Sequence, residues 1–550
     1  MTTTTTSRRA AGAQRLRPPR GVSRSTGSWL VIAAGVVVAA LSLLPLIFVV
    51  TTAAQIGWAE SASLILRPRV GELLTNTVLL VAITVPLCAV IGVGGAWLVE
   101  RTSLAGAGAW GAVLAMPLAI PAFVNSYAWV SAIPSLAGLG SGVLLATLSY
   151  FPLVYLPVRA ALARLDPALE QAAASLGRSP VRVFFGTVLP QLRLALLGGA
   201  LLVGLHLLSE YGAFALIRFD TFTTAIMDQY RSTFNGSAGS MLSGVLMLLC
   251  FALLLLESRA RGRARYARIG SGTAAPPRRI RLRGWQIPAQ LALLALGIAA
   301  LGVPAVVIGG WLAYGGAGVW TAPDLVPTLL QTLGLALGGG VVTVLAAFPL
   351  SWLAVRRPGA FSRLLERTNY VTSSMPGIVL ALALVTVSLF FVPALYQTTA
   401  LLLIAYALLF LPRALVPLQA GIAQAPRSLE EAAQALGRRP ARAFLGVTLR
   451  LVAPATAAAL AMVFLAVAGE LTATLLLSPI GVQTLATRFW SLSSEIDFAG
   501  AAPYATLLIV LSAPMTYLLF RQSAVLSTGR AADPAAVEPE TTASSKAETA

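Results

Sequence analysis

The sequence contains little charge and very little lysine, histidine or cysteine. Only 11% of its 550 residues are charged and 57% are apolar, whereas about a quarter of the residues in a soluble domain are charged. His206, Cys88 and Cys250 all fall in apolar runs, so neither a disulfide framework nor a metal cluster is expected. The single lysine, Lys546, follows no glycine-rich loop, which excludes a P-loop for ATP. The composition predicts a polytopic membrane protein without a catalytic constellation.

Runs without charge set the expected number of membrane spans, because one span needs about 20 apolar residues. These runs, two of them interrupted by one glutamate, are 25–59, 73–99, 102–158, 194–217, 232–256, 284–323, 325–355, 368–412, 451–487 and 498–520. Splitting the longest ones at proline and glycine clusters, near 134–142 and 393–397, gives about twelve spans. We therefore expect six spans in each half of the chain.

The two halves repeat one another. LEQAAASLGRSP, from Leu169, recurs 260 residues later as LEEAAQALGRRP, from Leu429, with eight of twelve positions identical. Further matches at offsets of 255 or 260 are Trp97 with Trp352, Glu210 with Glu470, and Thr224 with Thr484. Because an even number of spans gives both halves the same orientation, the repeat is parallel. The predicted fold is an all-α polytopic membrane protein of about 12 transmembrane helices, built as a parallel tandem repeat of two six-helix halves.

The positions of the arginines predict orientation and organisation. The net charge of +19 comes from arginines next to spans, a pattern that marks cytoplasmic loops rather than a nucleic-acid surface. We expect the repeated stretches and both termini to face the cytoplasm, and the lipid bilayer to be the surrounding partner. The expected segments are a disordered tail 1–27, a first half 28–260, a basic cytoplasmic linker 261–284, a second half 285–526 and a second disordered tail 527–550.

Each repeated stretch predicts a short helix, a glycine hinge and a second helix. In the second copy we expect Ser428 to cap the helix in a capping box with Glu431. In the first copy we expect Asp166 to be the cap and Pro167 to be the first helical residue. A left-handed glycine should end each short helix and a proline should begin the next one. These residues are Gly177 and Gly437, followed by Pro180 and Pro440.

The repeated stretches resemble the EAA loop of ABC-importer permeases, which reads Glu-Ala-Ala, three residues, Gly, nine residues, Ile-x-Leu-Pro. The first copy (166–190) carries Glu170, Gln171, Ala172, Ala173, Gly177 and Pro190, and the second (426–450) carries Glu430, Glu431, Ala432, Ala433 and Gly437. In that family the loop is a coupling helix that docks on an ATPase subunit. Gln171 replaces the glutamate and Arg450 replaces the proline, which suggests that the halves contact their ATPases unequally.

Over nearly the whole chain, two fused six-span halves resemble the ferric-iron importer permeases. The segments LSEYGAFALIRFDTFTTAIMDQY, from Leu208, and GELTATLLLSPIGVQTLATRFWS, from Gly469, carry this resemblance. It implies a permease in the cytoplasmic membrane that imports Fe(III) delivered by an extracytoplasmic binding protein. It also implies two separate ATPase subunits that hold ATP-Mg, with no cofactor on this chain. Thiamine, polyamine and phosphonate permeases share the architecture, and an ion-coupled secondary transporter is a further alternative.

Glu210 and Glu470 are candidates for the translocation path. A carboxylate within a span is costly and usually faces a cavity or a partner, so these residues either line the path or hold neighbouring helices. Near the first are the oxygen donors Tyr211, Asp220, Asp228 and Tyr230, of the hard type that suits Fe(III). Their counterparts are Leu471, Ile480, Arg488 and Trp490, so a metal contact would be one-sided. No metal site is firmly assigned; the candidate path is Glu210, Tyr211, Asp220 and Glu470.

Overall fold

A computed structural model describes residues 27–165, 167–232, 236–261, 279–373 and 375–528. Its regular elements within these ranges are helices, apart from one isolated bridge between Thr102 and Ile280. Nine of the described helices are long and apolar enough to cross a membrane, or up to eleven if each of two bent pairs is one span. The shorter apolar helix Gly377–Phe391 is a further candidate. The prediction of an all-α protein with about twelve spans is therefore confirmed.

The first half contains fourteen α-helices, a 3-10 turn and a π-helical turn in the described ranges. They are α1 (Gly27–Ser42), α2 (Leu44–Ile56), α3 (Trp58–Ile65), α4 (Pro68–Arg101), α5 (Ala107–Ala115), η1 (Met116–Ala119), α6 (Ala122–Ala132), α7 (Gly138–Tyr150), α8 (Pro152–Arg164), α9 (Pro167–Ser175), α10 (Pro180–Val183), η2 (Phe184–Val188), α11 (Leu189–Ser209), α12 (Gly212–Leu216), α13 (Phe222–Arg231) and α14 (Gly236–Arg261).

The second half repeats this order. Its elements are η3 (Arg283–Trp285), α15 (Gln286–Gly297), η4 (Ile298–Gly302), α16 (Val303–Gly315), η5 (Gly316–Trp320), α17 (Leu325–Arg356), α18 (Ala360–Ser373), α19 (Gly377–Phe391), η6 (Pro393–Leu395), α20 (Thr399–Gln424), α21 (Arg427–Ala435), α22 (Pro440–Ala443), η7 (Phe444–Thr448), α23 (Leu449–Ala468), α24 (Thr472–Leu477), α25 (Leu485–Ser494) and α26 (Phe498–Thr528). Most of the predicted linker and tails lies outside the described residues.

The predicted breaks occur, and the structure adds a sharper one. The chain leaves α-helical structure between α6 and α7 and again between α19 and α20, as the proline and glycine clusters predict. The apolar helices Ala107–Ala119 and Ala122–Ala132 are also bent by 91° relative to one another. Pro121 lies at this bend and cannot donate a backbone hydrogen bond, so the helix is interrupted there. Pro376 has the same position before α19 in the second half.

Small residues let the central helices of each half approach closely. Helices α4, α8 and α11 pack together in the first half, as α17, α20 and α23 do in the second. A Cβ added to Gly199 would lie 2.8 Å from the Cα of Val154, and one added to Gly92 would lie 2.8 Å from the Cβ of Val154. Membrane helices commonly use glycine in this way, because lipid provides no hydrophobic drive for helix association and close packing must supply it.

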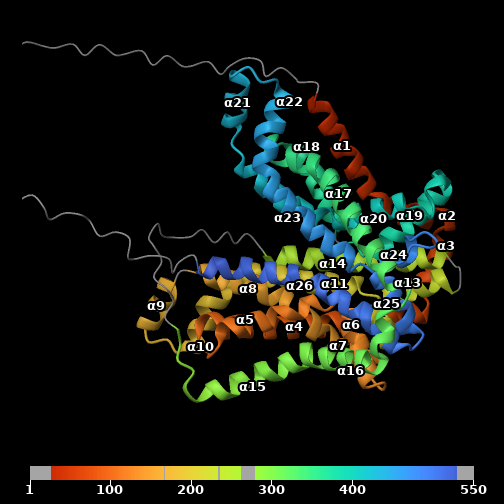
Figure 1. The fold of residues 1–550 in the computed structure, drawn as a ribbon. Coiled ribbons are helices and arrows are strands. Elements are labelled where there is room, and N and C mark those ends of the chain that lie inside the picture. Colours follow the sequence, from red (N-terminus) through yellow and green to blue (C-terminus); the bar gives the residue numbers. More distant parts are fainter. Residues whose placement is uncertain (1–26, 166, 233–235, 262–278, 374, 529–550) are drawn as a thin grey trace, which may run out of the picture.

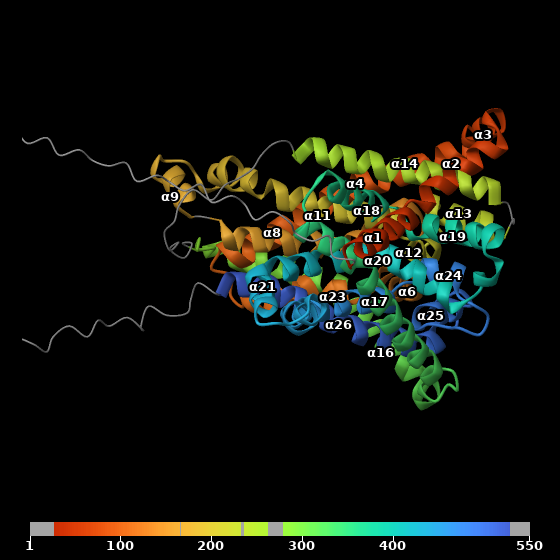
Figure 2. The ribbon, with the colours of Figure 1, turned by 90° about the horizontal axis from the view of Figure 1, so that it is seen from above.

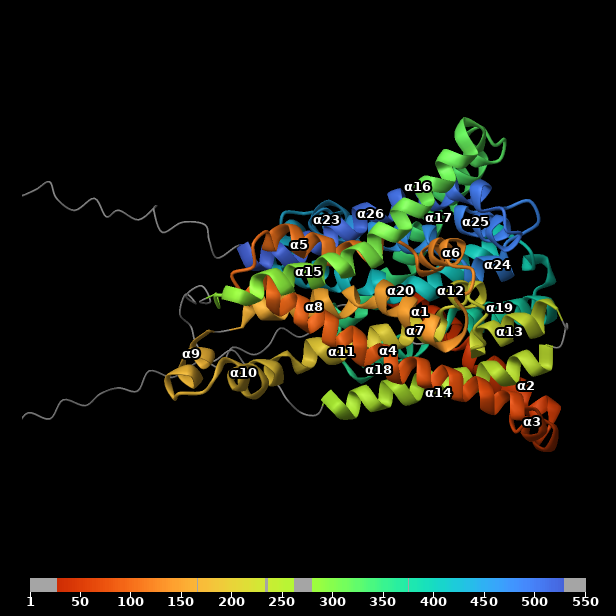
Figure 3. The same ribbon diagram turned by 90° about the horizontal axis from the view of Figure 1, so that it is seen from below.

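The first span of each half packs on the other half. Helix α1 packs against α17 and α18, and α2 packs against α19 (Figure 1). Reciprocally, α15 and α16 pack against α5 and α6 of the first half (Figure 3). Phe123 and Tyr211 of the first half also share a buried core with Phe489 and Trp490 of the second. The two halves therefore form one structure through an exchange of spans and a common aromatic core.

The short helices formed by the repeated motif lie apart from this core. Figure 2 shows α9 and α21 toward one end of the molecule, whereas α3, α13 and α25 lie toward the opposite end. Helix α9 packs on α10 and η2, and α21 packs on α22 and η7, so each remains within its own half.

Candidate coupling helices and central cavity

The repeated motif folds as two short, largely exposed helices, α9 and α21, which we call the EAA helices. Gly177 ends the first with φ +76° and Gly437 ends the second with φ +86°, so the predicted left-handed ends are confirmed. The leucines just before these glycines, Leu176 and Leu436, are 80% and 86% exposed. With Leu169 and Leu429, which are 53% and 47% exposed, they give each EAA helix an exposed apolar surface suited to a contact with another protein.

The start of the second EAA helix differs from the prediction. The structure begins α21 at Arg427 with Pro426 as its N-cap and no side-chain cap, so the proposed cap at Ser428 is wrong. Pro426 adopts φ −67° and ψ 135°, an extended conformation that begins the helix before Ser428 is reached. Helix α9 starts at Pro167 as predicted, although Asp166 lies outside the described residues. Pro180 and Pro440 begin α10 and α22, as predicted.

The motif residues divide into inward and outward faces. Ala173 and Ala433 are buried under their helices. The exposed ones are Gln171, Ala172, Pro190, Glu431 and Ala432. Glu170 and Glu430 are half-buried and point their carboxylates to the body of the protein. The exposed face is available to a partner, whereas the half-buried glutamates connect each EAA helix to the membrane helices.

In the first half, this connection is an ion pair. Arg101, the last residue of α4, lies 2.9 Å from Oε1 of Glu170 through its Nη2, and its side chain is only 3% exposed. The same nitrogen donates a hydrogen bond to the carbonyl of Leu162 at 3.2 Å. Burial raises the pKa of Glu170, and the positive charge of Arg101 opposes that rise. These contacts connect α9 to the end of α4 and to α8.

In the second half, the same positions make different contacts. Arg356, the counterpart of Arg101, donates to the carbonyl of Ala425 at 2.8 Å and lies over the ring of Trp352 at 5.1 Å. Glu430, the counterpart of Glu170, accepts a hydrogen bond from Thr448 at 2.9 Å. The second EAA helix is thus connected to the π-helical turn η7 through Glu430 and to the end of α17 through a hydrogen bond from Arg427 to the Arg356 carbonyl, without an ion pair. The two halves hold their EAA helices unequally.

Glu210 and Glu470 both cap short helices. Glu210 accepts a hydrogen bond from the hydroxyl of Tyr150 at 2.6 Å and from the backbone N–H of Ala213 at 2.9 Å. Glu470 accepts from the backbone N–H groups of Ala473 and Thr474, each at 2.9 Å, and from the Thr474 hydroxyl at 2.6 Å. Each carboxylate thereby accepts hydrogen bonds from N–H groups at the start of α12 or α24. These N–H groups have no hydrogen-bond partner within their own helix. These bonds favour the structural interpretation of the pair.

The same two glutamates line one cavity between the halves. This central cavity has a volume of about 300 Å³. Its polar and aromatic lining includes Tyr150, His206 and Glu210 from the first half and Phe410, Arg413 and Glu470 from the second. The other two residues of the candidate path, Tyr211 and Asp220, line a second cavity of about 660 Å³ with Arg69 and Asp228. The structure therefore divides the predicted path residues between two cavities.

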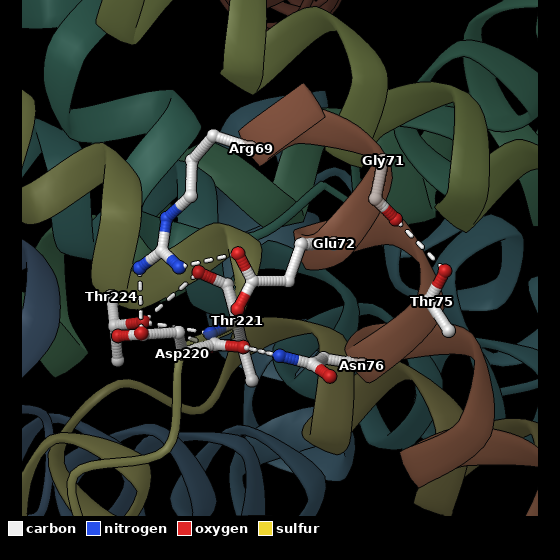
Figure 4. Close-up of polar contacts among 8 residues, drawn as sticks. All are labelled: Arg69, Gly71, Glu72, Thr75, Asn76, Asp220, Thr221 and Thr224. Atoms are coloured by element: carbon white, nitrogen blue, oxygen red, sulfur yellow. Dashed lines mark hydrogen bonds and ion pairs between the residues drawn. The ribbon is translucent and has the colours of Figure 1, made fainter. Parts of the chain in front are cut away.

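Asp220 belongs to a cluster of paired charges at the second cavity. Arg69 lies 2.7 Å from Glu72 and 2.6 Å from Asp220, and Asn76 donates to the Asp220 carbonyl at 3.1 Å (Figure 4). Thr221 and Thr224 form a capping box that begins α13 beside this cluster. Because the Asp220 carboxylate is engaged by a guanidinium, it is poorly placed to bind a cation in this conformation. Within the described ranges, no group of three or more His, Cys, Asp or Glu side chains could hold a metal ion.

Arg413 was not identified from the sequence, although the structure places it in the central cavity. The charge pattern predicted arginines in loops next to spans, but Arg413 lies in the middle of span α20. The only signal was that it ends the uncharged run 368–412 within a predicted span. In the first half the same position is Leu153, which also lines the cavity.

The fold and the site define a class of protein. Parallel halves with a polar cavity between them and two exposed EAA helices at one end form a two-half transport permease. Residues 339–527 match the family model "Binding-protein-dependent transport system inner membrane component". The chain belongs to this family of inner-membrane ABC permeases.

Particular relatives agree with this assignment. The Fe(3+)-transport system permease protein FbpB 2 of Haemophilus influenzae is 36% identical over 481 residues, which cover 86% of this chain and 95% of the relative. The sulfate transport system permease protein CysT of Salmonella typhimurium is 28% identical and covers 46% of this chain and 96% of its own length. The molybdenum transport system permease protein ModB of Escherichia coli is 31% identical over 22% of this chain and 60% of its own.

Proposed function

We propose that this permease imports Fe(III) delivered by an extracytoplasmic binding protein, with energy from separate ATPase subunits. The observation that carries the proposal is the similarity to an Fe(3+)-transport permease, which extends through both fused halves. The relatives named for sulfate and molybdenum align with a half or less of the chain. The same observation supports iron over thiamine, polyamine or phosphonate.

The two EAA helices, in this proposal, each dock on one ATPase subunit, which holds ATP-Mg. Their exposed leucine tips and outward motif residues support such a contact. Both helices and both termini then face the cytoplasm, as the arginine distribution predicts. ATP binding brings the two ATPase subunits together. Because the closed pair of ATPases favours one state of the permease over the other, ATP binding and hydrolysis shift the permease between its inward and outward states.

The ion-coupled alternative has less support. Membership in a binding-protein-dependent family counts against a carrier that works alone. The two glutamates that such a carrier would use are already hydrogen-bonded to helix N-termini. A coupling role for them would require those caps to break in every cycle.

A reconstitution experiment tests the proposal. The permease, its ATPase and its binding protein are placed in liposomes, and uptake of radiolabelled Fe(III) is measured with and without ATP. We expect ATP-dependent uptake that is lost when Glu431 and Gly437 are both replaced, while the permease stays in the membrane. Binding-protein-stimulated ATP hydrolysis without iron uptake would reject iron and direct the assay to thiamine, polyamines or phosphonates. Unchanged uptake in the altered protein would reject the coupling role of the EAA helices.

A further inference from the structure

The central cavity contains one charged side chain that has no partner. Arg413 is exposed to the cavity and makes neither a hydrogen bond nor an ion pair with any residue in the described ranges. Its guanidinium lies 5.1 Å from the ring centre of Phe410, which supports it from one side only. By contrast, both glutamates of the cavity are hydrogen-bonded to backbone or hydroxyl donors.

An arginine in this place needs an explanation. A permanent charge within a membrane span is costly and usually marks a substrate or ion pathway. Arginines that support the scaffold of this protein have partners: Arg159 lies 2.7 Å from Glu100, and Arg101 lies 2.9 Å from Glu170. Arg413 makes no such ion pair, although Glu210 and Glu470 line the same cavity. The scaffold therefore does not account for it.

The repeat provides a second, independent argument. Residues that hold the EAA helices or cap the short helices recur in both halves, as Arg101 and Arg356 or Glu210 and Glu470 do. Arg413 has Leu153 as its counterpart across the same cavity. Scaffold residues can also occur in one half only: Arg159 has Gln419 at the corresponding position, but it is ion-paired to Glu100. Arg413 also occurs once but has no such ion pair, so it is better explained by what passes through the space between the halves.

The chemistry of the guanidinium indicates the kind of ligand. Its planar set of donors binds carboxylate or phosphate oxygens in pairs, and it keeps its positive charge at any physiological pH. It repels a bare metal cation. The carboxylates that would attract such a cation are those of Glu210 and Glu470. Both oxygens of each already accept hydrogen bonds.

We infer that Arg413 binds an anionic oxygen ligand of the cargo, so that the metal crosses the central cavity as a complex with a carboxylate or phosphate group. The inference rests on the proposed import of iron. It assigns the central cavity a substrate class, a negatively charged or anion-bearing complex, rather than Fe(III) alone.

Double-label uptake in the reconstituted transporter tests the inference. Iron is supplied in one arm with labelled citrate and in the other with labelled phosphate. We expect one of these anions to accumulate with iron in a constant ratio. Arg413→Gln should lower uptake of both labels about tenfold or more, as for loss of a charged hydrogen bond, and Arg413→Lys should restore part of it. Entry of iron without either anion would overturn the inference, and so would native uptake by Arg413→Gln.

Two further variants separate a local defect from loss of the fold. Arg521→Gln removes an exposed arginine of α26 and should transport normally. Arg413→Leu combined with Leu153→Arg moves the charge to the symmetric position on the same cavity, and it should recover uptake relative to Arg413→Leu alone. Gel filtration and stimulated ATP hydrolysis show whether Arg413→Gln folds. If it does not fold, the double variant Arg413→Leu with Leu153→Arg tests the inference instead. Failure of a folded exchange protein to recover any uptake would then count against the inference.

The same assay distinguishes this inference from the proposed function. If the native protein takes up no iron but takes up sulfate or molybdate, and Arg413→Gln abolishes that uptake, the iron proposal is wrong and the anion site stands. If iron enters equally well in the native protein and in Arg413→Gln, the iron proposal stands and the anion site is wrong. Uptake of neither iron nor oxyanion, with ATP hydrolysis intact, would reject both.

Discussion

The ion pair between Arg101 and Glu170 is the residue-scale contact on which the first EAA helix depends. It joins a side chain that is 3% exposed to one that is 23% exposed. Removing one member of such a pair leaves the other charge desolvated without compensation, which is more damaging than the loss of an exposed pair. The second half lacks this vulnerability, because Glu430 is hydrogen-bonded to Thr448 instead.

We therefore predict that Arg101→Gln destabilises the protein more than Arg356→Gln. The first change should cost about 2–3 kcal/mol, below the full cost of breaking a buried pair, because Glu170 is partly exposed. The second removes a hydrogen bond to Ala425 and a contact with Trp352, which together cost about 1–2 kcal/mol. Melting temperatures of the purified proteins in detergent compare the two. Equal shifts would show that the ion pair has no special role.

Glu170 also gives the protein a predictable dependence on pH. Burial raises its pKa in the folded protein, with Arg101 opposing the shift, so the folded state binds the proton more tightly than the unfolded state does. This contribution to stability is present below the ordinary glutamate pKa of about 4.3 and is lost as the pH rises through the raised value. Glu170→Gln should remove that decline from a series of melting temperatures measured across this range. Parallel curves for the two proteins would contradict the prediction.

At the scale of the helix, close packing through glycine determines how the spans of the first half meet. Gly198 and Gly199 are neighbours in α11 with opposite surroundings. A Cβ on Gly199 would lie 2.9 Å from the carbonyl oxygen of Leu153, which belongs to the backbone and cannot turn aside. A Cβ on Gly198 would meet nothing within 4 Å.

We expect Gly199→Ala to lower the free energy of unfolding by about 1–3 kcal/mol, the usual cost of overpacking. Gly198→Ala should be neutral or slightly stabilising, since alanine favours the helix over glycine by about 1 kcal/mol. Thermal unfolding of the two variants beside the native protein measures the difference. The adjacent position is a matched control, because both changes add one methyl group to the same helix.

Helical elements were largely predictable, and their ends and bends were less so. Long uncharged runs and the proline and glycine clusters predicted the spans and two of their breaks, because hydrophobic length dominates membrane insertion. Gly177 and Gly437 predicted the ends of the EAA helices, because a left-handed residue strongly favours glycine. The start of α21 was missed because Pro426 replaces a side-chain cap. The 91° bend at Pro121 lies inside the uncharged run 102–158, where no change of charge marks it.

At the scale of the molecule, the halves share one core. The ring centres of Phe123 and Phe489 lie 5.6 Å apart, and those of Tyr211 and Trp490 lie 5.2 Å apart. Both pairs join the first half to the second, and the exchanged spans enlarge the same interface. We therefore expect the halves to stay together without the covalent connection.

We predict that two pieces produced by a break within 262–278 co-purify when they are expressed together. Replacing Phe489 and Trp490 with alanine should strongly reduce the recovered partner, because truncation of one buried aromatic costs about 3–5 kcal/mol. The control replaces two other consecutive aromatic residues, Phe390 and Phe391, which are each 79% exposed. Their replacement should leave the recovery of the partner half unchanged. Recovery of the tagged half alone from the native pair would contradict a shared core.

The candidate site was only partly predictable. The duplicated motif identified the EAA helices, and the intramembrane carboxylates identified Glu210 and Glu470. Their hydrogen bonds and the separation of Asp220 into another cavity depend on tertiary contacts between residues far apart in sequence. Arg413 was missed because one arginine among many carries no local pattern; only the arrangement of the two halves shows that it faces the central cavity.

The difference between Arg413 and Leu153 has a consequence for how such a cavity can arise. A permease assembled from two identical chains would place every lining residue twice, so one arginine would always face another. The two like charges would repel each other and would double the positive charge presented to the cargo. A fused chain is free of that restriction, since each half can change alone while the common architecture is retained. Fusion allows an odd number of charges on an axis of near symmetry.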